Sequence, residues 1–231
     1  PWQPVSFYTG YSEGKFIAIN TEATALFTTP ESSQQIEIGN KTTWFNDRLQ
    51  TNLALFRTTR TNYPITDTLG NVNIFNGKRI ANGIELDISG NPFSGFWLIF
   101  NTTLMDAKIV GDETVTVSGT RYNLDGKVPQ GIPEYSGSLW ATYEIQSGLL
   151  KGFGFGGGPT VKSGLYVDAR NLLRIPGFVV ADAVLFYKRQ NWQVQVNFRN
   201  ITNEIYYATP TFAGALPSEP FNFTISAKAR L

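Results

Sequence analysis

Two acidic residues, Glu85 and Asp87, are the strongest candidates for catalysis in this sequence. They are two positions apart, with Arg79 nearby, so they share one face if the segment is a strand. Paired carboxylates of this kind could serve as the acid and the base in hydrolysis of a glycosidic bond. The simpler interpretation is that they are polar residues facing a water-filled lumen, since apolar residues alternate with them along 84–88.

Three other patterns could bind cofactors or ions, but each lacks the context that its chemistry needs. The segment 152–158 (GFGFGGG) matches GxGxxG, yet strand-like sequence flanks it and no helix follows. Segment 77–79 (GKR) lacks the rest of a phosphate-binding loop. Asp67, Asp106 and Asp112 lie in or beside predicted long loops without the spacing of a calcium loop. We therefore predict no catalytic residue, no metal site and no bound cofactor.

The composition excludes several classes of function. The 231-residue chain has no His and no Cys, which removes the usual general base, thiolate nucleophiles and Cys-based zinc or iron–sulfur sites. Its net charge of +1 gives no long-range attraction to nucleic acid. Charged residues make up 16%, against about 25% in an ordinary soluble domain.

The dominant sequence period is two, which predicts strands rather than helices. Along 221–231 the apolar residues alternate with Asn, Thr, Ser, Lys and Arg, and 192–199 and 84–89 show the same alternation. Segments 96–105 and 135–146 are also strand-like, but their pattern leaves open which residues share a face. No window approaches the roughly 18 consecutive apolar residues of a transmembrane helix.

Tight turns and long loops alternate along the chain. We predict about ten strands, at 3–8, 34–45, 48–62, 78–90, 96–109, 136–146, 149–157, 178–189, 192–207 and 221–231. Short connections fall at 46–47, 90–95, 146–148 and 190–191; long ones fall at 9–33, 63–77, 110–135, 158–177 and 208–220. This alternation is typical of outer-membrane barrels, which have tight periplasmic turns and long external loops.

Aromatic residues are spaced as expected for the two membrane interfaces. Trp192 and Tyr206 are 14 residues apart on one predicted strand, which corresponds to about 33 Å along the membrane normal for a strand tilted by about 45°. We therefore predict that Tyr187 and Trp192 flank a periplasmic turn, with Tyr206 and Tyr207 at the outer rim. Trp44 is predicted to be a further interface aromatic.

Three all-β architectures fit these patterns. The favoured one is an antiparallel transmembrane β-barrel that forms part of a larger barrel. A self-contained ten-stranded pore or adhesin is geometrically possible, and it would require the first strand to pair with the last. The segment 3–8 is a poor closing partner because it is short and contains Pro4. A soluble β-sandwich binding module is the third possibility.

Several motifs in order resemble the C-terminal barrel of TonB-dependent siderophore receptors. The family commonly has a "PGY…D" strand, a turn and an Asn-Leu-Phe/Thr-Asn-x-x-Tyr-Tyr motif, which resemble 175–187 (IPGFVVADAVLFY) and 191–208 (NWQVQVNFRNITNEIYYA). Upstream, 37–41 (EIGNK), 50–62 and the segment 83–92 resemble the family's "E.G.K", "ITR.N" and "G.E.…G.P..G" segments. The resemblance covers nearly the whole chain.

The resemblance implies a 22-stranded barrel closed around an N-terminal plug, of which residues 1–231 are the C-terminal part, about ten strands, with no plug domain in this chain. It implies an outer-membrane receptor of a Gram-negative-type bacterium. Such a receptor takes up ferric siderophores as cargo and is energised by TonB through the plug, so its partners are membrane lipid, the siderophore and TonB. No enzymatic activity is implied. Loop positions expected to contact the siderophore are Tyr63, Arg121, Tyr122, Tyr135, Tyr166 and Arg170.

Overall fold

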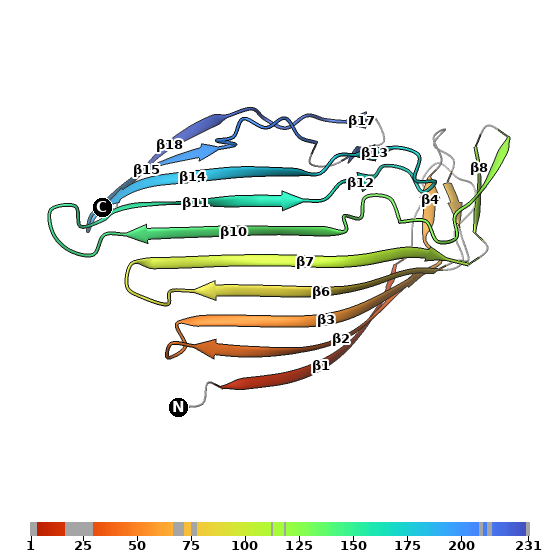
Figure 1. The fold of residues 1–231 in the computed structure, drawn as a ribbon, viewed down its shortest axis with the longest axis horizontal. Coiled ribbons are helices and arrows are strands. Elements are labelled where there is room, and N and C mark those ends of the chain that lie inside the picture. The colour runs from red at the N-terminus through yellow and green to blue at the C-terminus, as the bar shows by residue number, and fades with distance from the viewer. Residues whose placement is uncertain are drawn as a thin grey trace.

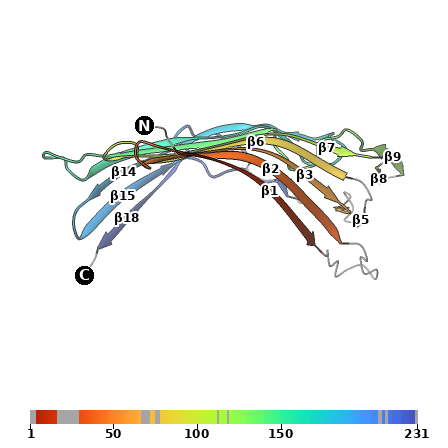
Figure 2. The ribbon, with the colours of Figure 1, turned by 90° about the horizontal axis from the view of Figure 1, so that it is seen from below.

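The computed structural model describes residues 4–16, 30–66, 72–74, 78–111, 113–117, 119–207, 210–211 and 214–229. These residues form one large antiparallel sheet with small hairpins at one end (Figure 1). Seen along its edge, the sheet is a single arched layer whose first and last strands bend to the same side (Figure 2). Among the described residues there is no helix long and apolar enough to cross a membrane.

The large sheet contains ten strands, each hydrogen-bonded to its neighbours in chain order. The strands are β1 (Val5–Phe16), β2 (Glu31–Trp44), β3 (Leu49–Thr61), β6 (Lys78–Gly90), β7 (Phe96–Val110), β10 (Tyr135–Glu144), β11 (Phe153–Lys162), β14 (Phe178–Lys188), β15 (Trp192–Arg199) and β18 (Asn222–Ala229). Within the described part of the long connections there are four two-stranded hairpins: β4 (Pro64–Thr66) with β5 (Val72–Ile74), β8 (Thr114–Val117) with β9 (Thr120–Asn123), β12 (Leu165–Tyr166) with β13 (Arg174–Ile175), and β16 (Pro210–Thr211) with β17 (Gly214–Ala215).

The pairing register sorts the side chains onto two different faces. One cross-strand row on the first face runs Ile38, Leu55, Ile84, Leu104 and Tyr135. We call this the apolar face. A row on the opposite face, the polar face, runs Lys41, Asn52, Asp87, Asn101 and Ser138. Successive side chains therefore alternate between the two faces, as the predicted period of two requires. Glu85 shares the polar face with Asp87.

Strand β14 is an exception, because it carries apolar side chains on both faces. Val180 and Val184 lie on the polar face and are buried, with 7% and 4% exposure. Phe186 on the same face is accommodated by a glycine of the neighbouring strand β11, because a Cβ on Gly154 would lie 2.1 Å from the Phe186 ring. The GxGxxG-like segment therefore contributes to packing within the sheet, as expected for glycines in a barrel strand.

Three predicted strands had limits that were wrong by four residues or more. Strand β1 extends to Phe16 instead of ending at 8, because residues 5–16 pair with β2 without interruption despite their polar sequence. Strand β11 runs over 153–162 rather than 149–157, since Gly148 and Gly152 adopt positive φ and lengthen the preceding turn. Strand β15 ends at Arg199, not 207, because Asn200 adopts a left-handed conformation with φ 51°.

The two outer strands lie at opposite ends of the sheet. Strand β1 is at one end of the order and β18 at the other, and the described residues of these strands do not pair. Figure 2 shows the arch open on the side between them. This arrangement does not support a self-contained ten-stranded barrel, and the single main sheet does not support a β-sandwich. It fits an arc of a wider barrel.

Candidate functional site

An aromatic row lies across the apolar face at the end of the sheet that has the short turns. Tyr187 and Trp192 flank the β14–β15 turn and make an edge-to-face contact at 5.5 Å. Phe96 and Tyr143 are cross-strand partners beside them, and Trp44 occupies the equivalent end of β2. Trp44 and Trp192 are 40% and 43% exposed. Three of the predicted interface aromatics therefore share one face and one end.

The other two predicted interface aromatics are placed differently. Tyr206 and Tyr207 lie beyond the end of β15, so the length estimate that put Trp192 and Tyr206 on one strand was wrong. The Tyr206 ring stacks on Phe178 at 4.1 Å, and Phe178 is the cross-strand partner of Lys162 on the polar face. Tyr206 is therefore at the long-loop end, packed toward the polar side, and Tyr207 beside it is half-buried.

At the long-loop end the connections build a small core of their own. Tyr63, Ile109, Val115, Leu124 and Ala169 form one buried cluster, which we call the loop core. Its members come from the ends of β3 and β7, from the β8–β9 hairpin and from the segment between β12 and β13. Three connections that are far apart in sequence are thus packed together.

A buried polar contact lies at one side of the loop core. The Tyr63 hydroxyl donates a 2.5 Å hydrogen bond to Oε2 of Glu113, and the Arg79 guanidinium lies 3.5 Å from the centre of the Tyr63 ring. Burial, reinforced by the hydrogen bond to Glu113, raises the pKa of the Tyr63 phenol well above its usual range. Burial also raises the pKa of the Glu113 carboxyl, although Tyr63 and Arg79 oppose that shift.

Tyr63 does not fit the direct ligand contact that the sequence suggested. Its side chain is 1% exposed, and its hydroxyl is already engaged. Its role in the structure is to join the β3 connection to Glu113 and Arg79. Glu113 was missed from the sequence because a lone acid in a long loop gives no signal of burial.

Two other predicted positions, Tyr122 and Arg170, are brought together. The Arg170 guanidinium lies 5.2 Å from the centre of the Tyr122 ring, at the edge of the loop core. Arg121 is exposed, and its Nε donates a hydrogen bond to the Thr114 hydroxyl across the β8–β9 hairpin. A cation next to an aromatic ring at a loop surface can contact a polar aromatic ligand.

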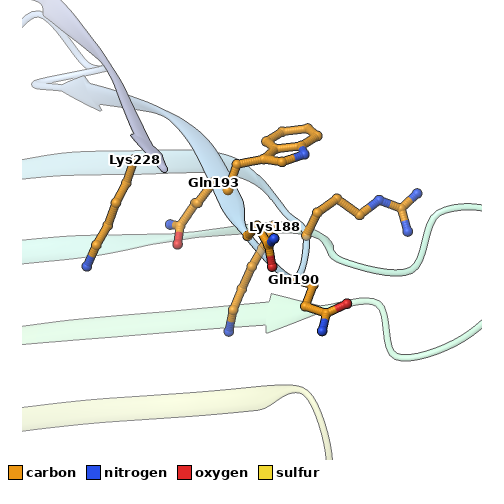
Figure 3. Close-up of a pocket in the computed structure, with 7 residues that line it drawn as sticks. Lys188, Gln190, Gln193 and Lys228 are labelled. Carbon is orange, nitrogen blue, oxygen red and sulfur yellow. The ribbon is translucent and has the colours of Figure 1, made fainter. Parts of the chain in front are cut away.

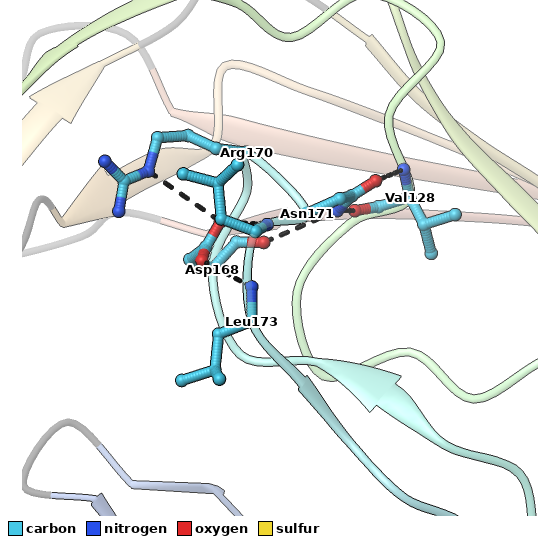
Figure 4. Close-up of polar contacts among 6 residues, drawn as sticks. Val128, Asp168, Arg170, Asn171 and Leu173 are labelled. Carbon is cyan, nitrogen blue, oxygen red and sulfur yellow. Dashed lines mark hydrogen bonds and ion pairs between the residues drawn. The ribbon is translucent and has the colours of Figure 1, made fainter.

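The segment that carries Arg170 is fixed by a polar turn (Figure 4). Asp168 accepts backbone hydrogen bonds from Leu172 and Leu173, and its Oδ1 lies 3.8 Å from Nε of Arg170. The Asn171 side chain accepts a hydrogen bond from the Val128 backbone N–H and donates one to the Val128 carbonyl. The Asp and Asn turn residues are a signal that the sequence could have given.

The remaining two predicted contacts diverge. Tyr166 is half-buried in the β12–β13 hairpin, with the Arg174 guanidinium 5.8 Å from the centre of its ring. Tyr135 begins β10 opposite Leu104, so its side chain belongs to the apolar face and is 45% exposed. Tyr166 is placed among the loops, whereas the position of Tyr135 resembles that of an interface aromatic.

Asn200 was missed from the sequence, and it fixes the connection between β15 and β18. Its side-chain amide donates hydrogen bonds to the carbonyls of Glu204 and Glu219 at 2.8 and 3.0 Å. Its backbone N–H donates to Asp182 on β14. The residue is 4% exposed, so these contacts satisfy a buried polar group.

These features match those of a known family. A family model described as "TonB dependent receptor-like, beta-barrel" matches residues 2–201. The chain belongs to this family. The TonB-dependent receptor barrel described above is 28% identical over 210 residues to the ferric-pyoverdine M114 receptor PbuA of Pseudomonas sp. strain M114, covering 87% of the chain and 24% of that relative.

Solved structures share the fold of this TonB-dependent receptor barrel. The siderophore receptor PiuA from Acinetobacter baumannii superimposes with a TM-score of 0.83 at 22% identity, covering 97% of this chain and 34% of PiuA. The ferric-catecholate import receptor Fiu from K12 E. coli gives a TM-score of 0.75 at 23% identity, covering 97% of this chain and 33% of Fiu. The chain spans about a quarter of the length of the curated relatives it matches.

Proposed function

We propose that the protein acts in the outer membrane of a Gram-negative bacterium as a receptor for ferric siderophores, energised through TonB. The observation that carries the proposal is the division of one sheet into an apolar face with an aromatic row and a polar face with long loops at one end. A barrel of this kind presents its apolar face to lipid and its polar face to the lumen. The names of the relatives, receptors for ferric pyoverdine and catecholates, support the cargo class.

Within this proposal the siderophore contacts lie among the external loops. Arg121, Tyr122, Tyr166 and Arg170 are the contacts we propose, because each is exposed or half-buried at the long-loop end. Tyr63 would act indirectly by holding the loops, and Tyr135 would face lipid. The iron is carried as a chelate, so aromatic and polar side chains suffice for binding and no protein ligand to iron is required.

Uptake of iron-55 tests the proposal. The full natural protein is expressed in a strain that lacks its own siderophore receptors, and cells are supplied with ferric pyoverdine or a ferric catecholate. We expect uptake of at least one chelate that disappears when TonB is deleted. Uptake that is independent of TonB would favour a passive pore, and binding without uptake would contradict the transport role.

Loop variants refine the binding proposal. Tyr166→Ala and Arg170→Ala should each weaken siderophore binding by about tenfold, equivalent to about 1.4 kcal/mol. Lys151→Ala, in the β10–β11 turn at the other end, is the matched control that should bind normally. Equal weakening in all three variants would mean that the loops named here do not form the binding surface.

A further inference from the structure

The β14–β15 turn carries a cation in an unusual position. The Arg189 guanidinium lies 4.8 Å from the centre of the Tyr187 ring, and Tyr187 in turn contacts Trp192. Arg189 is exposed, and its side chain has no carboxylate partner among the described residues. The guanidinium is therefore oriented by aromatic stacking while its N–H donors remain available.

A hollow of about 330 Å³ surrounds this turn. Among the described residues, its lining includes three cations, Lys188, Arg189 and Lys228, and no acidic side chain. Figure 3 shows the Lys188, Gln193 and Lys228 side chains extending together to one side of the strands; the register places them on the polar face. The Glu144 carboxylate lies 3.8 Å from Lys188 and compensates part of this charge. Lys188 and Lys228 thus place positive charge on the polar face, whereas Arg189 lies beside Tyr187 on the apolar side of the turn and is the cation that an anion on that side would meet.

The surface next to Arg189 is apolar. Tyr187 pairs with Val194, and the next apolar pair along the same strands is Leu185 with Val196. Leu185 and Val194 are 42% and 39% exposed. A ligand held by Arg189 would thus have hydrocarbon surface beside its anionic group, which is the chemistry of a lipid with a phosphate headgroup.

We propose that Arg189, supported by Tyr187 and Trp192, binds the phosphodiester of an anionic glycerophospholipid whose acyl chain lies along Val194 and Leu185. The Gln190 and Asn191 side chains, which also line the hollow, supply amide donors to the headgroup. The short turns face the periplasm in the proposed orientation, so the lipid comes from the inner leaflet and not from lipid A. This inference rests on the proposed membrane location.

Native mass spectrometry of the protein purified from outer membranes tests the site. The protein is reconstituted into nanodiscs of phosphatidylcholine with one quarter phosphatidylglycerol, and the lipids retained after release into detergent are counted. We expect retention of phosphatidylglycerol in preference to phosphatidylcholine, and Arg189→Gln should lower that preference about fivefold, as expected for one interfacial cation. Arg189→Lys should lose part of the preference for phosphatidylglycerol, because the lysine ammonium lacks the planar array of N–H donors of a guanidinium.

Lys151→Gln is the matched control, because it removes the same charge from a neighbouring turn. An equal loss in Lys151→Gln and Arg189→Gln would overturn the site in favour of general surface charge. Equal retention of the two lipids would overturn the site as well. Heat-modifiable migration on gels monitors folding of each variant. Failure to insert into the nanodisc bilayer would overturn the membrane location itself, whereas insertion without lipid preference would overturn only the site.

Discussion

The two ends of the sheet differ in how far their apolar side chains are buried. At the short-turn end the large apolar side chains remain exposed, with Leu149 at 98% and Trp192 at 43%. At the long-loop end Ile109 and Leu124 are fully buried by neighbouring connections. The long-loop end thus has a core of its own, whereas the short-turn end leaves its apolar side chains at the surface, as the proposed contact with lipid requires.

The largest expected effect comes from removing a side chain at the centre of the loop core. Leu124→Ala should destabilise the packed loops by about 2–4 kcal/mol, because it leaves a cavity among Tyr63, Ile109 and Val115. Hydrogen exchange should rise over 113–128 and remain unchanged in β14 and β15. Leu149→Ala is the matched control at the opposite end, and a comparable effect there would break the contrast between the two ends.

The next effect concerns the buried hydroxyl. Tyr63→Phe leaves the Glu113 carboxylate without its donor, which should cost about 1–3 kcal/mol. Limited proteolysis of the β8–β9 hairpin gives the measurement. Tyr143→Phe, at the short-turn end, removes a hydroxyl that has no partner among the described side chains and should leave the cleavage rate unaltered; faster cleavage in that variant would argue against the specific role of Glu113.

A smaller effect is expected from one indole of the aromatic row. Trp192→Ala should lower the unfolding free energy in a bilayer by about 1 kcal/mol, since the ring is already half-exposed to the surroundings. Trp97→Ala provides the comparison, because Trp97 is 45% exposed but pairs with Thr142 on the polar face. If denaturant titration in lipid gives the larger loss for Trp97, the assignment of the lipid-facing side is incorrect.

The smallest effect is electrostatic. The pKa of Tyr63 is raised in the folded state above its ordinary value of 10.0, so folding favours the protonated phenol and stability should fall as the pH rises above about ten. The pKa of the Glu113 carboxyl is also raised in the folded state, above its ordinary value of 4.5. Its contribution to stability should therefore also fall as the pH rises above that value. The phenolate absorbance of both proteins is titrated with pH, and the Tyr63→Phe curve is subtracted from the wild-type curve. The difference, which reports Tyr63, should rise at a higher pH than for an ordinary tyrosine. A rise at the ordinary pKa would contradict the burial of Tyr63.

The sequence period predicted the strands and their faces where polar and apolar residues alternate. Residues 192–199 and 84–89 behave in this way, and both pair in the predicted sense. The facing of 96–105 and 135–146 could not be assigned, because apolar residues occur on both faces there and only the register with β6 and β11 decides it.

The candidate site was predicted less well than the sheet. Loop residues were selected by type, and Tyr63 shows why type is insufficient: its burial depends on Glu113 and Leu124, which are more than forty residues away in sequence. The extent of β1 was missed for a related reason. Its polar, glycine-containing sequence resembles a loop, and its strand conformation is stabilised by the backbone of β2.

The Asn200 amide has a consequence for how the sequence of this barrel can vary. The Asn200 side chain forms hydrogen bonds to both sides of a surface loop, at Glu204 and at Glu219. The backbone N–H of the same residue is hydrogen-bonded to Asp182 on β14. Sequence changes between those two points therefore need not disturb the pairing of β15 with β18. The segment between those two points can therefore accept substitutions and changes of length while the strands that support it stay the same.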